Sequence, residues 1–95
     1  MDVYAQIAEK IIEGQEAIIG PVAVEQAQQV KNMKVNWSEH TVTILSDGVK
    51  VIEDLVEVYK QLFGQISVEV SKESAAGVLS TLTGEQLPLS LRSSH

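Results

Sequence analysis

Two stretches of this sequence carry nearly the same pattern, and they decide the fold. The first is Ile18-Ile19-Gly20-Pro21-Val22-Ala23-Val24-Glu25, and the second, forty-four positions later, is Leu62-Phe63-Gly64-Gln65-Ile66-Ser67-Val68-Glu69. Each stretch lies between two segments in which apolar residues recur at helical spacing. We therefore interpret the chain as two units, each made of a helix, a glycine and a second helix.

Gly20, Pro21 and Gly64 are the expected hinges of these units. Proline has no amide hydrogen and disfavours the helical region for the residue before it, but it suits the first turn of a new helix. Gly20 and Pro21 should therefore end one helix and begin another, and Gly64 should do the same in the second unit. The predicted helices cover residues 2–19, 21–33, 48–63 and 65–82.

Residues 34–45, between the two units, follow a different pattern. They are rich in β-branched residues that partly alternate with polar ones, and a polar segment, Ser38-Glu39-His40, interrupts them. This pattern is typical of a β-hairpin, which is marginal in water by itself and must pack on helices or pair with another chain. The predicted fold is α+β and mainly helical, with residues 1–84 forming one domain.

Superposing the units at a shift of 44 suggests an internal duplication, with coincidence as the alternative. Gly20 pairs with Gly64, and the small residues Ala23 and Ala27 pair with Ser67 and Ser71. Apolar matches alone prove little, because amphipathic helices match at some shift. If the duplication is real, an approximate twofold axis should relate the units and bring the Ala23/Ala27 ridge near the Ser67/Ser71 ridge, where helices can approach closely.

The apolar faces of the helices are wider than one small bundle requires. We expect Ile18, Ile19, Leu62, Phe63 and Ile66 in the core, with part of this surface shared with another subunit. The tail, residues 85–95, has leucines at alternate positions. It should be extended, and we expect it to pack on the domain, to dock into a neighbour or to lead into further chain. Its last residues, Ser93-Ser94-His95, are interpreted as an addition from expression. The candidate interface residues are Trp37, Val42, Ile44, Leu87, Leu89 and Leu91.

Composition excludes several classes of partner. The formal net charge of -6 and pI near 4.7 oppose nucleic-acid binding, which draws its affinity from Lys and Arg. No apolar run approaches the roughly 18 to 20 residues that span a bilayer, and the amino terminus has no signal-peptide character. We therefore expect no membrane association and a location in the cytoplasm of a prokaryote.

No pattern of catalytic, metal-binding or cofactor-binding residues stands out. Glu25 and Glu69 could form a carboxylate pair, but helical di-metal sites also need Glu-x-x-His, and a surface position is the favoured interpretation. His40 falls in the predicted hairpin turn, where a solvated role is favoured. The expected protein has no cofactor and no enzyme activity.

The sequence therefore predicts a small interaction or regulatory module, most simply a closed homodimer, with another protein as a further partner. A different class stays open as the alternative. In it, the chain is a small-molecule sensor or carrier whose apolar pocket, between the two units, is lined by Ile18, Val22, Leu62 and Ile66.

Overall fold

The computed structural model describes residues 2–80 of the 95-residue chain. Its elements are, in order, α1 (Val3–Ile19), α2 (Val22–Ala27), β1 (Met33–Asn36), β2 (Thr41–Ile44), α3 (Gly48–Phe63) and α4 (Gln65–Leu79). The predicted α+β, mainly helical fold with a hairpin between helices is confirmed. The predicted tail, with Leu87, Leu89 and Leu91, lies outside the described residues.

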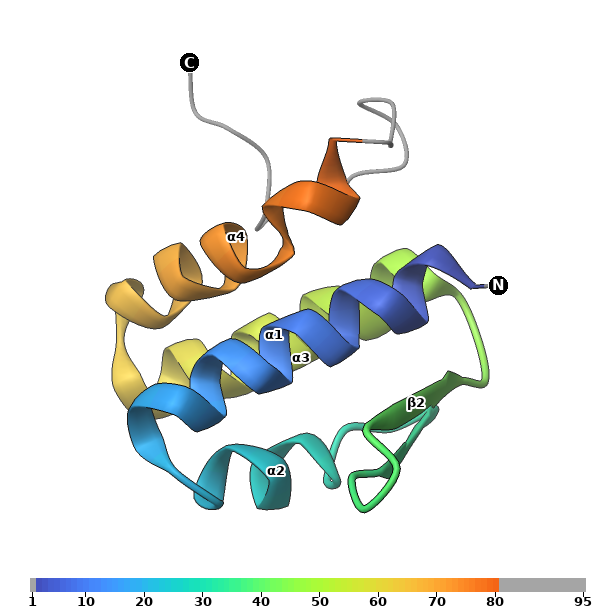
Figure 1. The fold of residues 1–95 in the computed structure, drawn as a ribbon, viewed down its shortest axis with the longest axis horizontal. Helices are drawn as coiled ribbons and strands as arrows, with labels where there is room; N and C mark the ends of the chain where they lie inside the picture. The colour runs from blue at the N-terminus through green and yellow to red at the C-terminus, as the bar shows by residue number, and fades with distance from the viewer. Residues whose placement is uncertain (1, 81–95) are drawn as a thin grey trace.

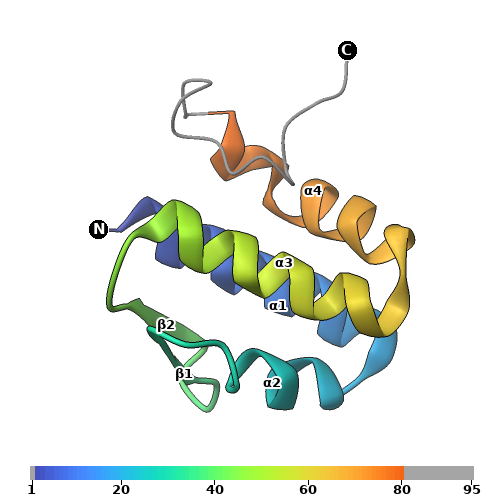
Figure 2. The same cartoon turned by 180° about the vertical axis from the view of Figure 1, so that it is seen from behind.

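Helices α1 and α3 lie side by side at the centre and run in the same direction, so both begin at one end of the molecule (Figure 1). Helix α4 covers one side of this pair and α2 covers the other, as both views show (Figures 1 and 2). The hairpin lies beyond the end of α2, with β2 against α1. The fold thus has three layers, with the α1/α3 pair in the middle.

The central pair supplies most of the core. Aspartates cap both helices: the Asp2 carboxylate accepts from the Tyr4 amide at 2.9 Å, and the Asp47 carboxylate accepts from the Val49 amide at 3.1 Å. Such caps satisfy amides that a helix start leaves unpaired. In addition to Ala5 on α1, each helix buries five residues at helical spacing: Ile7, Ala8, Ile11, Ile12 and Gln15 on α1, and Val51, Ile52, Leu55, Val56 and Tyr59 on α3. These two sets pair one to one at the shift of 44.

Helix α2 is shorter than the predicted helix over residues 21–33. It ends at Ala27, and the next amides bond three residues back: Gln29 to the Gln26 carbonyl and Val30 to the Ala27 carbonyl, both at 3.1 Å. Asn32 then adopts a left-handed conformation, φ 62°, which asparagine tolerates better than most residues. This reversal directs Met33 into the first strand rather than into another helical turn.

The hairpin strands alternate as a half-buried sheet requires. Val35 pairs with Val42 and Met33 with Ile44, and these side chains face the helices; Lys34, Asn36, Thr41 and Thr43 form the exposed face. The connecting loop turns through a hydrogen bond from the His40 amide to the Trp37 carbonyl, 3.1 Å, with His40 at φ 53°. The sheet packs on the helices, as an isolated hairpin cannot hold its fold.

The two hinges are alike. Gly20 has φ 78° and ψ -160°, and Gly64 has φ 82° and ψ -171°. The Gly20 amide donates to the Glu16 carbonyl at 2.9 Å, and the Gly64 amide to the Lys60 carbonyl at 2.8 Å. Both hinges lie at the same end of the molecule, where α1 turns into α2 and α3 turns into α4 (Figure 1).

Two buried hydrogen bonds occupy equivalent positions in the two helical units. The Gln15 amide on α1 donates to the Ser67 carbonyl on α4 at 2.9 Å, and the Tyr59 hydroxyl on α3 donates to the Ala23 carbonyl on α2 at 2.6 Å. Both donors and both acceptors are equivalent at the shift of 44. The units are therefore arranged as an approximate twofold rotation would place them, while their common origin stays a prediction.

The predicted direct approach of the two small-residue ridges needs correction. Ala23 and Ala27 are fully buried on α2, and Ser67 and Ser71 are buried on α4, but these helices lie on opposite sides of the central pair (Figures 1 and 2). Each ridge faces α1 and α3 instead of the other ridge. The small side chains let α2 and α4 approach the central layer, where Tyr59 and Gln15 reach their carbonyls.

Candidate functional site

The hinge end of the molecule exposes large apolar side chains. The exposed fractions are 65% for Ile18, 52% for Leu62, 37% for Phe63 and 72% for Ile66. The expectation that these four residues belong to the core was wrong, because the chain turns back at Gly20 and Gly64 before any described segment covers the last turns of α1 and α3. Only Ile19, partly buried, packs against the core as expected.

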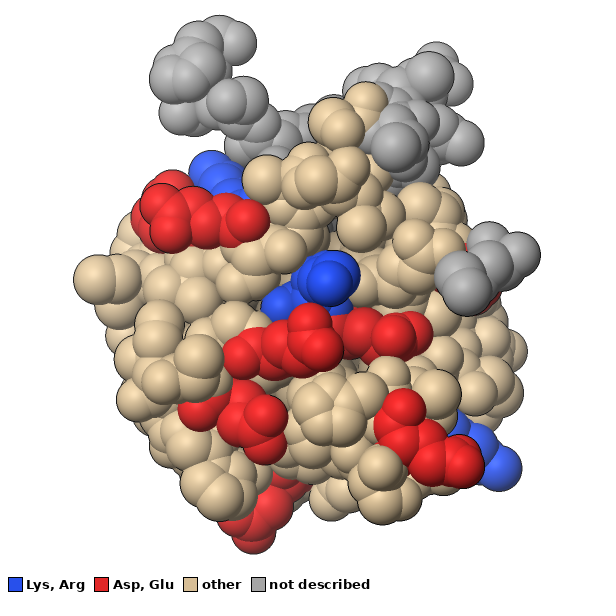
Figure 3. Space-filling view, in the orientation of Figure 1, with Lys and Arg blue, Asp and Glu red and all other residues tan. Residues whose placement is uncertain are grey.

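This end face, defined as Ile18, Leu62, Phe63 and Ile66 with the hinge residues Gly20, Pro21 and Gly64, has no charged residue. Residues 17–24 and 61–68 contain no Asp, Glu, Lys or Arg, whereas the chain elsewhere is acidic enough to give a net charge of -6. Acidic side chains cross the middle of the view in Figure 3, and much of its left edge, where Figure 1 places the hinges, is uncharged. The end face is therefore both apolar and neutral.

Trp37 holds the hairpin loop to α1 through polar contacts. Its indole Nε1–H donates to both carboxylate oxygens of Glu16 at 3.2 Å, and its ring stacks on His40 with centroids 4.3 Å apart. Nδ1 of His40 lies 3.5 Å from Oε2 of Glu13, also on α1. Trp37 is half-buried, so it has an anchoring role within the chain whether or not it contacts a partner.

The other two candidate interface residues within the described range are Val42 and Ile44. Val42 is buried in the core against the helices, which corrects its assignment to an interface surface. Its neighbours in the strand, Thr41 and Thr43, lie on the exposed face, so the apolar face of the hairpin is the one that the helices cover. Ile44 is partly buried at the edge of the same core.

The side chains considered for chemistry do not converge. Glu25 and Glu69 are both exposed, on α2 and α4, which lie on opposite sides of the central pair. Within residues 2–80, no group of three or more His, Asp or Glu side chains could hold a metal ion. Neither carboxylate is thus part of an evident catalytic or metal centre in this range.

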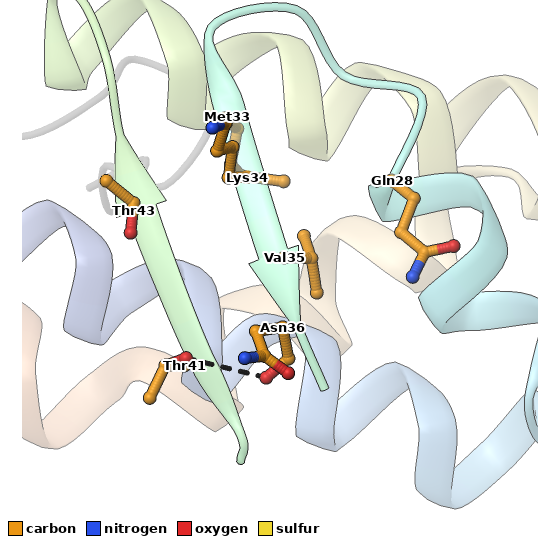
Figure 4. A pocket seen from close by; sticks show the side chains of 7 residues that line it. All are labelled: Gln28, Met33, Lys34, Val35, Asn36, Thr41 and Thr43. Atoms are coloured by element: carbon orange, nitrogen blue, oxygen red, sulfur yellow. Dashed lines mark hydrogen bonds between the residues drawn. The ribbon is translucent and has the colours of Figure 1, made fainter. Parts of the chain in front are cut away.

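Two hollows in the described surface lie at the hairpin, and another lies between the residues that follow α2 and the outer side of α3. An open one of about 500 Å³ is lined by both strands and by Gln28, which follows α2 (Figure 4). Its lining is Gln28, Met33, Lys34, Val35, Asn36, Thr41 and Thr43, with the Thr41 hydroxyl donating to the Asn36 carbonyl at 3.5 Å. This mixture of side chains lacks the apolar enclosure of a typical small-molecule site.

The sequence did not lead us to identify Gln15 and Tyr59 as equivalent, buried hydrogen-bond donors. Nε2 of Gln15 also lies 3.1 Å from the Ser71 hydroxyl, and that hydroxyl donates to the Ser67 carbonyl at 2.9 Å. Burial, together with the charge of Glu16, raises the pKa of Tyr59 well above its usual range. Position in the sequence could have revealed the burial of Gln15, because Gln15 follows Ile11 by four residues and is the equivalent of Tyr59 at the shift of 44.

No known protein family, curated protein or solved structure matches this chain. In the described part of the chain, no helix is both long and apolar enough to cross a bilayer. The apolar side chains of the end face are exposed, and no segment within residues 2–80 covers them.

Proposed function

We propose that this chain is a small, non-enzymatic interaction or regulatory module that acts as a homodimer. The observation that supports it is the end face, which exposes Ile18, Leu62, Phe63 and Ile66 together at one end of the fold. Clustered apolar residues on a surface are typical of sites of protein association, whereas singly scattered ones need no explanation. The prokaryotic cytoplasm remains the proposed location.

The absence of a convergent polar cluster in residues 2–80 favours binding over chemistry. Enzyme sites need a nucleophile or acid–base group within hydrogen-bond reach of its partner, and often a group of shifted pKa inside a cleft. The strongly shifted group described here, Tyr59, bonds to a backbone carbonyl inside the core and faces no cleft. Its role is structural.

The alternative, a sensor or carrier with an apolar pocket between the units, has less support. Ile18, Leu62 and Ile66, three of the four residues expected to line that pocket, are largely exposed instead. A pocket that binds an apolar ligand should enclose most of its surface. A small molecule that raises the melting temperature of the protein in a ligand screen would support this alternative.

Size-exclusion chromatography with light scattering tests the proposed state. We expect a mass that rises from one chain toward two as the protein concentration increases from about 10 µM to about 1 mM, since an interface of a few side chains per copy gives modest affinity. A constant mass of one chain throughout would contradict the homodimer. Affinity capture from the source cells then tests for a protein partner.

A further inference from the structure

We infer that the end face is the homodimer interface and that its occupant is the end face of a second copy of this chain. The inference rests on the proposed function and adds the surface, the partner and the geometry. Ile18 and Leu62 would lie near the centre of the contact, with Phe63 and Ile66 beside them. Three observations favour a second copy over another occupant.

The first observation is charge. A chain of net charge -6 repels a second copy of itself, and like charges brought face to face disfavour association. The end face avoids this cost, since residues 17–24 and 61–68 are without charge. Glu16, Glu25, Lys60 and Glu69 flank these two stretches and remain outside the apolar centre. The end face is therefore a surface that two acidic copies can bring together.

The second observation is the repeated pattern of the face. Ile18 and Leu62 are equivalent in the two units, as are Gly20 and Gly64, and both hinges lie at this end (Figure 1). A twofold dimer uses the same patch on both copies, so the patch must be complementary to itself. A face that already presents one pattern twice meets this requirement in more than one orientation.

The third observation is the path of the chain. Residue 3, where α1 begins, and Leu79, where α4 ends, lie toward the end of the molecule opposite the hinges (Figure 1). The described chain therefore neither enters nor leaves through the end face. Among the described residues, an approaching copy meets the two hinges, the last turns of α1 and α3 and the first turn of α4.

Single charge substitutions test the interface. Ile18→Glu and Leu62→Glu, measured separately by sedimentation velocity, should each raise the dimer dissociation constant at least tenfold, because each places two carboxylates in one apolar contact. Leu45→Glu is the matched control. Leu45 is also apolar and 55% exposed, but it lies just after β2, away from the hinge end, so its substitution should leave the dissociation constant within twofold of the original.

A mixing experiment separates loss of contact from loss of fold. Ile18→Lys and Ile18→Glu should each be monomeric alone, and an equal mixture of the two should associate again, because opposite charges then meet across the interface. Far-UV circular dichroism should show the original helix content for every variant, since Ile18 and Leu62 are exposed in the single chain.

The outcomes distinguish this inference from the proposed function. A dimer that survives both Ile18→Glu and Leu62→Glu, or that is weakened by Leu45→Glu instead, overturns the end-face interface and leaves the homodimer standing. An original chain that stays monomeric at about 1 mM overturns both. If monomeric Ile18→Glu does not associate when it is mixed with Ile18→Lys, the face-to-face geometry is overturned.

Discussion

At the scale of single residues, the two hinge glycines carry backbone conformations that other residues avoid. With φ 78° and ψ -160° at Gly20, and φ 82° and ψ -171° at Gly64, both residues lie in a region that is essentially restricted to glycine. A Cβ at either position would meet no atom within 4 Å, so the restriction comes from the backbone alone. The same property allows both helices to reverse within one residue.

We expect Gly20→Ala and Gly64→Ala each to lower the free energy of unfolding by about 1–3 kcal/mol, the cost of holding alanine in that region. Urea unfolding followed by circular dichroism measures the change. Gly77→Ala is the control, because Gly77 lies inside α4 with open space around it, and alanine there should raise the free energy by up to about 1 kcal/mol. A neutral Gly64→Ala would show that the hinge relaxes easily.

The raised pKa of Tyr59 predicts that the folded protein loses stability at alkaline pH. Its pKa in the unfolded chain is about 10 and is higher in the folded chain, mainly because the ring is buried and then because Glu16 is near. Above pH 10 the unfolded chain releases this proton and the folded chain keeps it. The stabilisation is therefore complete below pH 10 and decreases above it, by up to about 1.4 kcal/mol per pH unit.

The comparison of Tyr59→Phe with the original chain isolates this effect. At pH 7 the variant should be less stable by about 1 kcal/mol, because it loses the hydrogen bond to the Ala23 carbonyl. The difference should shrink as the pH rises past 10, since phenylalanine does not ionise. Parallel stability curves for the two proteins from pH 8 to about pH 11 would contradict the assignment.

At the scale of elements, α1 and α4 pack closely at Gly14. A Cβ added there would clash with the hydroxyl of Ser74 and lie 2.8 Å from the Ser74 Cβ. An isolated glycine within a helical pattern indicates a bend or a close contact, and at Gly14 the structure shows a close contact. The partner could not be read from the sequence, since the approach joins residues sixty positions apart.

Gly14→Ala should therefore destabilise the fold by about 1–3 kcal/mol, although alanine favours a helix, because overpacking outweighs the gain in propensity. Ser74→Gly should restore part of this loss in the double variant while costing stability alone. Thermal unfolding of the four proteins completes the cycle. Additive effects of the two substitutions would indicate that the helices separate without strain.

The order of elements was predictable because each rests on local signals. Helical periodicity located α1, α3 and α4, and alternation located the hairpin within one residue at each strand end. The end of α2 was not predictable, because it depends on the tight turns after Ala27 and on Asn32 rather than on apolar spacing. The prediction that the helix ends are buried was also wrong, because Ile18 and Leu62 have the right spacing but no element within residues 2–80 covers them.

At the scale of the whole molecule, the arrangement of the two units was only partly foreseen. The pattern predicted equivalent hinges, which the structure has, and a direct approach of the two small-residue ridges, which it does not have. Which side of a central pair each outer helix covers is decided by packing of distant residues such as Gln15 with Ser67. Sequence spacing contains no information on that choice.

The proposed homodimer also predicts a stability that depends on protein concentration. Because only the folded chain dimerises, the melting temperature should rise as the concentration increases from about 10 µM to about 1 mM. Differential scanning calorimetry measures the shift. The Ile18→Glu variant should melt at the same temperature at every protein concentration. A melting temperature that is the same at both extremes for the original chain would argue against association of the folded state.

The parallel central pair has a consequence for synthesis of the chain. Helix α1 is made first, yet its apolar face is completed by α3 and by α4, which supplies the carbonyl that Gln15 bonds fifty-two residues later. At about 5–20 residues per second, the ribosome leaves this face uncovered for several seconds. Contacts between such distant segments also slow folding relative to helical proteins built from neighbouring helices. The nascent chain therefore exposes part of the apolar face of α1 until α4 has been made, which is when chaperones or an already folded copy would meet it.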